Sequence, residues 1–196
     1  PASCLPIVAS MAPETMTEPL PETPEGGVLA AAVERLLEMR HDVIACGPGL
    51  GRGPEAAAFV RALLDRATVP LVLDADALCV VGDTPDVLRR REERSVVITP
   101  HPGEMARLTG QTIEQVQANR LEVATAFAKA HGVYVILKGH RTLVATPSGD
   151  ASINPTGNPG MATGGTGDVL TGMVAAWLAQ LLDAESACRL GVQQLR

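Results

Sequence analysis

Short apolar runs alternate along the chain with longer segments in which apolar residues recur every three or four positions. The short runs are nearly continuous in valine, isoleucine and leucine, as expected of strands that a sheet buries on both faces. They span residues 43–46, 69–73, 95–98 and 133–137. Strands that alternate with helices in this way predict an α/β fold with a mostly parallel sheet.

The longer segments predict helices, and several of them carry start or stop residues. Pro54 stands where a helix can begin without its N–H, Thr112 and Gln115 match a capping box, and Gly132 ends the segment that follows. We expect helices over 28–40, 54–67, 84–91, 112–131, 169–182 and 184–196. The fourth is predicted to be one long helix with a core face at Ile113, Val116, Val123, Ala124, Phe127 and Ala130. The apolar composition of 169–182 predicts a mostly buried helix.

Two further segments predict minor β-structure. Residues 1–27 hold six of the 15 prolines and one short apolar run at 5–9, which predicts an edge strand followed by an irregular connection. Residues 138–153 combine a short apolar run with a Pro-Ser-Gly-Asp turn, which predicts a small β-excursion beside the main sheet.

The length of the chain limits the number of domains, and its charge limits the kinds of partner that it can bind. A chain of 196 residues with 46% hydrophobic content can bury one sizeable core and is short for two domains. The formal net charge of −6 argues against nucleic acid or an anionic membrane as a partner, because both require a basic face. No apolar run approaches the roughly 18 residues of a membrane span, so we expect a cytoplasmic protein.

The cysteines and histidines give no sign of a metal centre. Cys4, Cys46, Cys79 and Cys188 are widely spaced without a CxxC, and we interpret them as buried thiols rather than disulfides or zinc ligands. The histidines show no ligand spacing either, so we expect no protein-held transition metal.

A glycine-rich stretch at 154–172 is the strongest candidate site. It holds six of the 19 glycines and places Asp168 directly before an apolar helical run. Successive backbone N–H groups at such a helix start favour an anion, whereas a carboxylate there would repel phosphate. Asp168 therefore suggests chemistry, most simply proton abstraction. The alternative is an ordinary glycine-rich loop whose aspartate only caps the helix.

Four other strand ends carry polar groups to the same predicted edge of the sheet. They are the glycine turn 47–51, the acids Asp74 and Asp76, His101 between two prolines, and Lys138. The turn is neither a dinucleotide fingerprint nor a P-loop. Each feature alone has a structural alternative, such as a tight turn, a cap or a solvated lysine. Convergence of five segments on one rim favours a ligand site.

The motifs also resemble a known family. Thr99-Pro-His-Pro-Gly-Glu104, Lys138-Gly-x-x-Thr142 and the string from Gly157 to Gly172 resemble the ADP-dependent NAD(P)H-hydrate dehydratases, the C-terminal domain of bifunctional nicotinamide nucleotide repair proteins. The resemblance implies a ribokinase-like three-layer sandwich with a mostly parallel central sheet flanked by helices. It further implies that residues 1–196 form a single domain that is incomplete at both termini.

The resemblance assigns site residues and partners. Gly49, His101 and Asp168 would contact the hydrated nicotinamide nucleotide, with Asp168 also catalytic. The nucleotide-binding residues would be Lys138, Gly139, His140, Arg141, Thr142, Gly164, Gly165, Thr166 and Gly167. ADP would be the co-substrate, and Mg²⁺ would be held through its phosphates. A homo-oligomer such as a tetramer is expected, as is an epimerase domain that is either fused or separate.

The predicted reaction is dehydration of NAD(P)H hydrate, driven by conversion of ADP to AMP and phosphate. Asp168 would act on the ring hydroxyl, while the glycine amides and Lys138 would stabilise the transferring phosphoryl group. Two alternatives share these residues. A ribokinase-like vitamin or sugar kinase would release a stable phosphorylated product, and a non-catalytic nucleotide sensor would bind without turnover.

Overall fold

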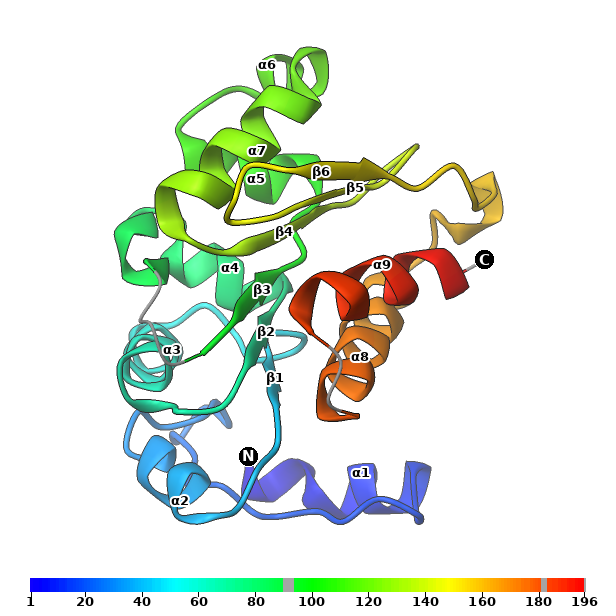
Figure 1. Ribbon diagram of the computed structural model, residues 1–196. Coiled ribbons are helices and arrows are strands. Elements are labelled where there is room, and N and C mark those ends of the chain that lie inside the picture. Colours follow the sequence, from blue (N-terminus) through cyan, green and yellow to red (C-terminus); the bar gives the residue numbers. More distant parts are fainter. Residues whose placement is uncertain (90–93, 181–182, 196) are drawn as a thin grey trace.

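A computed structural model describes residues 1–89, 94–180 and 183–195 of the chain. Its centre is a six-stranded sheet with the strands in sequence order (Figure 1). The strands are β1 (Ile44–Cys46), β2 (Leu71–Leu73), β3 (Val96–Ile98), β4 (Tyr134–Leu137), β5 (Leu143–Ala145) and β6 (Ala151–Ile153). β1 to β4 pair in parallel, and β4, β5 and β6 pair antiparallel. The predicted parallel sheet and its β-excursion are both confirmed.

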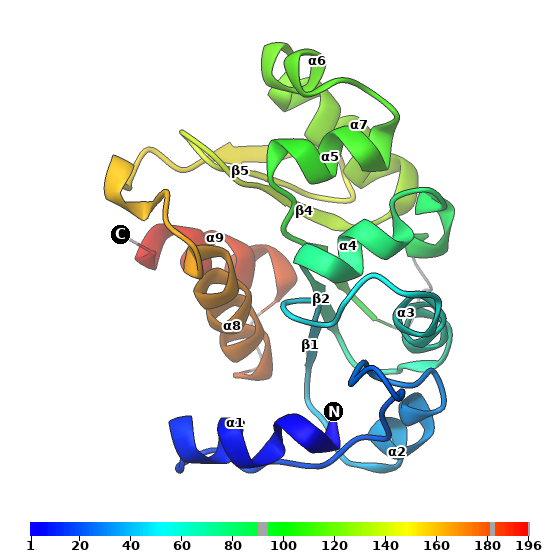
Figure 2. The ribbon, with the colours of Figure 1, turned by 180° about the vertical axis from the view of Figure 1, so that it is seen from behind.

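Helices cover both faces of this sheet and complete the three layers (Figures 1 and 2). One face packs against α3 (Pro54–Arg66), α4 (Ala75–Val81), α5 (Pro102–Thr109) and α7 (Arg120–His131). The other face packs against α8 (Thr166–Ala179) and α9 (Ala184–Gln194). α2 (Ala32–Glu38) packs on α3, and α6 (Ile113–Ala118) packs on α5.

Side-chain alternation along the strands divides the apolar residues into two cores. In β2, Leu71 and Leu73 belong to the core under α3 and α7, whereas Val72 belongs to the core under α8 and α9. β3 and β4 divide in the same way, because successive residues of a strand point to opposite faces. All three residues of β2 are fully buried, which explains why these strands lack polar alternation in the sequence.

The predicted N-terminal edge strand is wrong. Residues Leu5–Met11 form the helix α1, with Pro6 in its first turn, where the missing N–H costs nothing. A helix satisfies its own backbone hydrogen bonds, so this segment needs no neighbouring strand. α1 contributes no buried residue, and Ile7 and Met11 lie largely exposed.

The predicted long helix from residue 112 is also wrong. The backbone breaks at Asn119 (φ −129°, ψ 37°), where α6 ends and α7 begins. The capping box of Thr112 and Gln115 is present, as is the left-handed Gly132 stop. Because of the break, the predicted core face does not hold throughout: Ile113 and Ala130 are exposed.

Other helices differ in extent or burial. α2 is shorter than predicted, because Val28 instead forms a bridge with Glu22. Residues Pro85–Leu88 form a 3-10 turn, and the rest of the helix predicted to reach residue 91 lies outside the described residues, apart from Arg89. The sequence patterns missed α4 and α5 altogether.

Two predictions about burial are wrong. α8 buries only Leu170, Thr171, Val174 and Leu178, since one of its faces lies open to solvent. All four cysteines are free, but only Cys188 is buried: Cys4 is exposed, and Cys46 and Cys79 are half-buried. None of the helices in the described ranges is long and apolar enough to cross a membrane.

We predict that Leu63→Ala lowers the free energy of unfolding by about 3 kcal/mol, because a fully buried leucine leaves a cavity. Leu121→Ala is the matched control on another helix, where the side chain is 52% exposed, and it should change stability by less than about 0.5 kcal/mol. Urea denaturation measures both. Equal losses in the two variants would contradict the proposed position of the core.

Candidate active site

The carboxyl ends of the parallel strands bring four predicted segments to one edge of the sheet. One residue directly follows each parallel strand: Gly47 after β1, Asp74 after β2, Thr99 after β3 and Lys138 after β4. Ligands bind at this edge in open α/β sheets. The convergence predicted from the sequence is therefore present.

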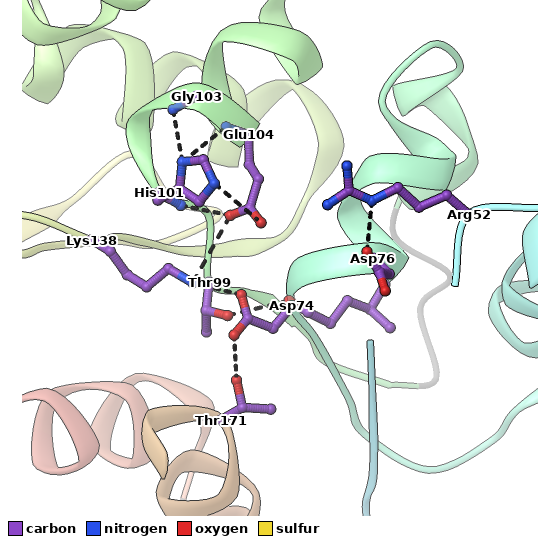
Figure 3. A network of polar contacts seen from close by, with 10 residues as sticks. Arg52, Asp74, Asp76, Thr99, His101, Gly103, Glu104, Lys138 and Thr171 are labelled. Atoms are coloured by element: carbon purple, nitrogen blue, oxygen red, sulfur yellow. Dashed lines mark hydrogen bonds and ion pairs between the residues drawn. The ribbon is translucent and has the colours of Figure 1, made fainter. Parts of the chain in front are cut away.

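A buried ion pair joins two of these strand ends. Lys138 Nζ lies 2.6 Å from Asp74 Oδ1, and Thr171 Oγ1 on α8 donates a hydrogen bond of 3.0 Å to Asp74 Oδ2 (Figure 3). Asp74 is only 1% exposed. A carboxylate at that depth needs compensation by a charge and by hydrogen bonds, and these contacts supply both. The pair ties β2, β4 and α8 together.

His101 is fixed at the start of α5 by a reciprocal cap. Its Nδ1 accepts hydrogen bonds from the backbone N–H groups of Gly103 (2.9 Å) and Glu104 (3.4 Å), while Glu104 Oε2 accepts from the His101 N–H (2.8 Å). An accepting Nδ1 places the proton of the neutral ring on Nε2. The side chain is 56% exposed, and its Nε2 lies 3.5 Å from Glu104 Oε1, so the cap fixes both the tautomer and the orientation of the ring.

Glu104 is a second buried acid beside the same lysine. Its side chain is 7% exposed, and its Oε2 lies 3.9 Å from Lys138 Nζ. Burial raises the pKa of Glu104; the His101 N–H, Lys138 and the His101 ring oppose this shift, and Asp74 adds to it. Two buried carboxylates thus share one ammonium group.

The glycine turn after β1 is anchored by Asp76 on α4. Asp76 accepts hydrogen bonds from the Gly51 N–H (3.0 Å) and from Arg52 Nε (2.7 Å), and the Arg52 contact chiefly holds the pKa of Asp76 below its usual range. Gly47 has φ +143°, and a Cβ there would lie 1.8 Å from the Asp74 carbonyl oxygen. Gly49 has no such neighbour within 4 Å. Asp76 is therefore a loop anchor.

The glycine stretch meets the ion pair at the start of α8. Gly165 has φ +89° at the N-cap, and a Cβ on Gly167 would lie 3.3 Å from Lys138 Nζ and 3.4 Å from Asp74 Oδ2. Asp168 follows in the first helical turn and is exposed. Among the described residues, none forms a hydrogen bond or ion pair with its side chain. Its carboxylate is free to meet a ligand.

A cavity of about 630 Å³ lies beside this junction. Its lining includes His101, the whole segment 138–142, Thr166 and Gly167, so it gathers most of the predicted nucleotide-binding residues. Gly164 and Gly165 line an adjoining open hollow, which shares Thr166 with the cavity. Gly49 and Asp168 line neither of the two. The structure therefore gathers most of the predicted residues at the cavity or the hollow, but not these two.

Several residues at this site had no predicted role. In the sequence, Asp74 is only a strand-end acid, and Glu104 and Thr171 are only members of longer motifs. The cavity wall also includes Asn154, Thr156 and other residues of the loop before Gly164. A Pro- and Gly-rich composition marks that loop in the sequence, but composition does not show which of its residues face inward.

Comparison with known proteins supports the family resemblance that these motifs indicate. A family model described as NAD(P)H-hydrate dehydratase matches residues 6–192. A bifunctional NAD(P)H-hydrate repair enzyme from Moorella thermoacetica is 48% identical over 187 residues, covering 94% of this chain and 35% of that protein. An ADP-dependent (S)-NAD(P)H-hydrate dehydratase from Neisseria meningitidis is 41% identical over 157 residues, covering 78% of this chain and 53% of that protein. The chain thus spans about a third to a half of the length of these relatives.

Solved structures agree on the fold. An ADP/ATP-dependent NAD(P)H-hydrate dehydratase from Bacillus subtilis, co-crystallized with ATP/Mg²⁺, superposes with a TM-score of 0.84 at 34% identity and covers 99% of this chain and 65% of its own. A pyridoxal kinase from Lactobacillus plantarum superposes with a TM-score of 0.63 at 17% identity, covering 85% of this chain and 64% of its own. The second likeness concerns the fold alone. The α/β ribokinase-like architecture expected from the sequence is confirmed.

We predict that Lys138→Met costs about 3 kcal/mol of unfolding free energy, because it leaves the buried Asp74 carboxylate without a counter-charge. Adding Asp74→Asn in the same molecule should recover part of that loss, since only the Glu104 carboxylate then remains without the ammonium. Urea denaturation of both singles and the double completes the cycle. A double variant no more stable than Lys138→Met would show that charge compensation is not the cause.

A second prediction concerns pH. The pKa of folded Glu104 lies above its unfolded value, so burying the charged form costs stability above the folded pKa, and that cost disappears as pH falls toward the unfolded value. Glu104→Gln keeps an oxygen to accept the His101 N–H. It should therefore be more stable than the wild type at pH 8, with the difference narrowing near pH 4.5. Thermal unfolding across this pH range measures it, and a difference that does not change with pH contradicts it.

Proposed function

The chain belongs to the NAD(P)H-hydrate dehydratase family, and on that premise we propose that it dehydrates (6S)-NAD(P)H hydrate to NAD(P)H while ADP is converted to AMP and phosphate. The observation that carries this proposal is the junction of Asp168, Gly167 and the Lys138–Asp74 pair beside the cavity. A proton acceptor, an anion cradle and a cation lie together there. We further propose that residues 1–196 belong to one ribokinase-like domain, because a single sheet supports both cores.

The cavity fits the nucleotide. The segment 138–142 and Thr166 supply hydroxyl, backbone and cationic groups along its wall. Gly167 also lines the cavity, and Gly164 and Gly165 line the adjoining hollow at the start of α8. ADP would place its phosphates at this helix start, where Lys138 already stands. His101 and Gly49 would contact the hydrated nicotinamide on the other side of Asp168. The cap holds the exposed His101 ring in a fixed orientation for that contact.

The proposed reaction has two steps. Asp168 removes the proton of the ring hydroxyl, whose oxygen then attacks the terminal phosphoryl group of ADP, releasing AMP. The glycine amides and Lys138 stabilise the charge on the transferring group. Loss of phosphate together with a ring proton then restores the dihydronicotinamide. Phosphorylation serves to convert a poor leaving group, hydroxide, into a good one.

Magnesium is the ion that this arrangement would take. Among the residues that the structure describes, no group of three or more His, Cys, Asp or Glu side chains could hold a metal by itself. Mg²⁺ is commonly held by phosphates and water with only one or two carboxylates. Asp74 is 1% exposed and already bound to Lys138 and Thr171, so Mg²⁺ would be held mainly through phosphates and water. The ion would neutralise charge on the phosphates of the nucleotide.

The relatives' names bear on partners. Fused repair enzymes and stand-alone dehydratases both occur among them, so an epimerase domain, either fused or separate, is part of the proposal. We propose ADP as the co-substrate, in keeping with the name of the Neisseria relative. A homo-oligomer remains a prediction from the resemblance.

Asp168→Asn should lower the rate of NADH formation from NADH hydrate, ADP and Mg²⁺ by roughly 10²- to 10⁴-fold in the full-length protein, because it removes the general base. ADP binding by calorimetry should survive. Asp150→Asn, in the exposed hairpin turn after β5, is the matched control and should keep full activity. Undiminished turnover in Asp168→Asn would refute the assignment. A stable phosphorylated product without release of phosphate would indicate a kinase instead.

A further inference from the structure

Arg120 is the first residue of α7, and it reaches the segment that is proposed to bind the nucleotide. The break at Asn119 puts it at the end of α7 nearest the carboxyl end of β4. Its Nη2 donates hydrogen bonds to the carbonyl oxygens of Leu137 (3.0 Å) and Lys138 (3.3 Å), and its Nη1 donates to the Lys138 oxygen as well (3.3 Å). One guanidinium group thus holds the last two peptide groups before the loop.

The loop is built around this guanidinium. Gly139 has φ +132°, a conformation that favours glycine, and a Cβ there would lie 2.9 Å from Arg120 Nη1, so the guanidinium packs closely on this residue. Lys138 is held from the other side, since its N–H donates to the Pro100 oxygen at 2.9 Å. Thr142 Oγ1 closes the turn by donating to the Gly139 oxygen at 3.0 Å. Arg120 is the link between this loop and a helix outside it.

The charge of Arg120 is not used in an ion pair. Within the described ranges, no acidic side chain pairs with it, and its remaining bond is to the amide oxygen of Gln117 (3.0 Å). Half-burial lowers the pKa of Arg120. Burying half of a guanidinium group costs free energy, because the charged group loses hydration. Here only two backbone carbonyl oxygens and one side-chain amide replace the lost water. Orienting those peptides is what it contributes.

We propose that Arg120 is a positioning residue for nucleotide binding: it fixes the Leu137–Lys138 peptides so that the segment 138–142 lines the cavity in its binding conformation. This inference rests on the proposed function, because it takes ADP as the ligand of that cavity. Arg120 itself lies outside the cavity wall. Its effect reaches the nucleotide through the backbone of Lys138 and Gly139.

Arg94 provides a matched control. Its Nε donates to the Ala67 oxygen (2.6 Å) and its Nη2 to the Leu64 oxygen, so it also spends a buried guanidinium on two backbone carbonyls. It precedes β3, at the amino end of the sheet, whereas the cavity lies at the carboxyl end. A change at Arg94 removes the same kind of bond without touching the site.

The test compares Arg120→Gln, Arg120→Lys and Arg94→Lys in the full-length protein by steady-state kinetics and by ADP calorimetry. Arg120→Gln should raise both the KM and the Kd for ADP roughly tenfold, the effect expected of losing charge-assisted hydrogen bonds, with the KM for NADH hydrate unchanged. Arg120→Lys should show a smaller rise. Arg94→Lys should lower the melting temperature and leave ADP binding unchanged.

Two results would overturn the inference: ADP constants of Arg120→Gln equal to those of the wild type, or an equal rise in Arg94→Lys. If Arg120→Gln fails to fold, Arg120→Lys decides by the same measurements. Failure of the proposed function is seen separately. A wild-type protein that binds ADP but forms no NADH would refute the dehydratase activity, while the calorimetric comparison would still test the role of Arg120.

Discussion

The ion pair between Asp74 and Lys138 is the interaction on which the site depends. Asp74 directly follows β2, Lys138 directly follows β4, and Thr171 of α8 completes the hydrogen bonds of the carboxylate. The pair therefore links the sheet to α8, the helix that begins in the glycine-rich segment 164–167. Because a buried charge cannot stay unpaired, the positions of these three elements are coupled. The same coupling brings Gly167 within 3.4 Å of both side chains, measured from where its Cβ would be.

Much of the fold could be predicted from the sequence, because strands buried on both faces leave continuous apolar runs. The segments that failed are those decided by tertiary neighbours. Leu5–Met11 has the composition of a strand but no strand partner, and it forms a helix. Asn119 interrupts an apolar period that would otherwise continue. α4 and α5 begin directly after strands, at Asp74 and His101. Both residues are N-caps, but their side chains are equally typical of a ligand site, so the sequence does not mark them as helix starts.

The sequence predicts which segments meet at the candidate site but not which of their side chains contact one another. Parallel topology alone puts the carboxyl ends of β1 to β4 together, so Gly47, Asp74, His101 and Lys138 could be grouped without coordinates. Lys138 pairs with Asp74, which lies 64 residues away in the sequence, and the sequence alone does not show which acid is near enough in space. The same holds for Arg120, whose partners lie on another element and are backbone atoms. A contact to a carbonyl oxygen leaves no mark on the sequence of its partner.

Three acids at this rim show how the surroundings divide their roles. Asp74 is buried and paired, so protonation or removal would strand Lys138 and disturb α8. Asp76 is held ionised by Arg52 and anchors the glycine turn. Asp168 is exposed at a helix start, and no described residue shares its carboxylate. A general base must gain and lose a proton in each cycle without loosening the fold. Of the three, only Asp168 is free for that proposed role, because no described residue depends on its carboxylate.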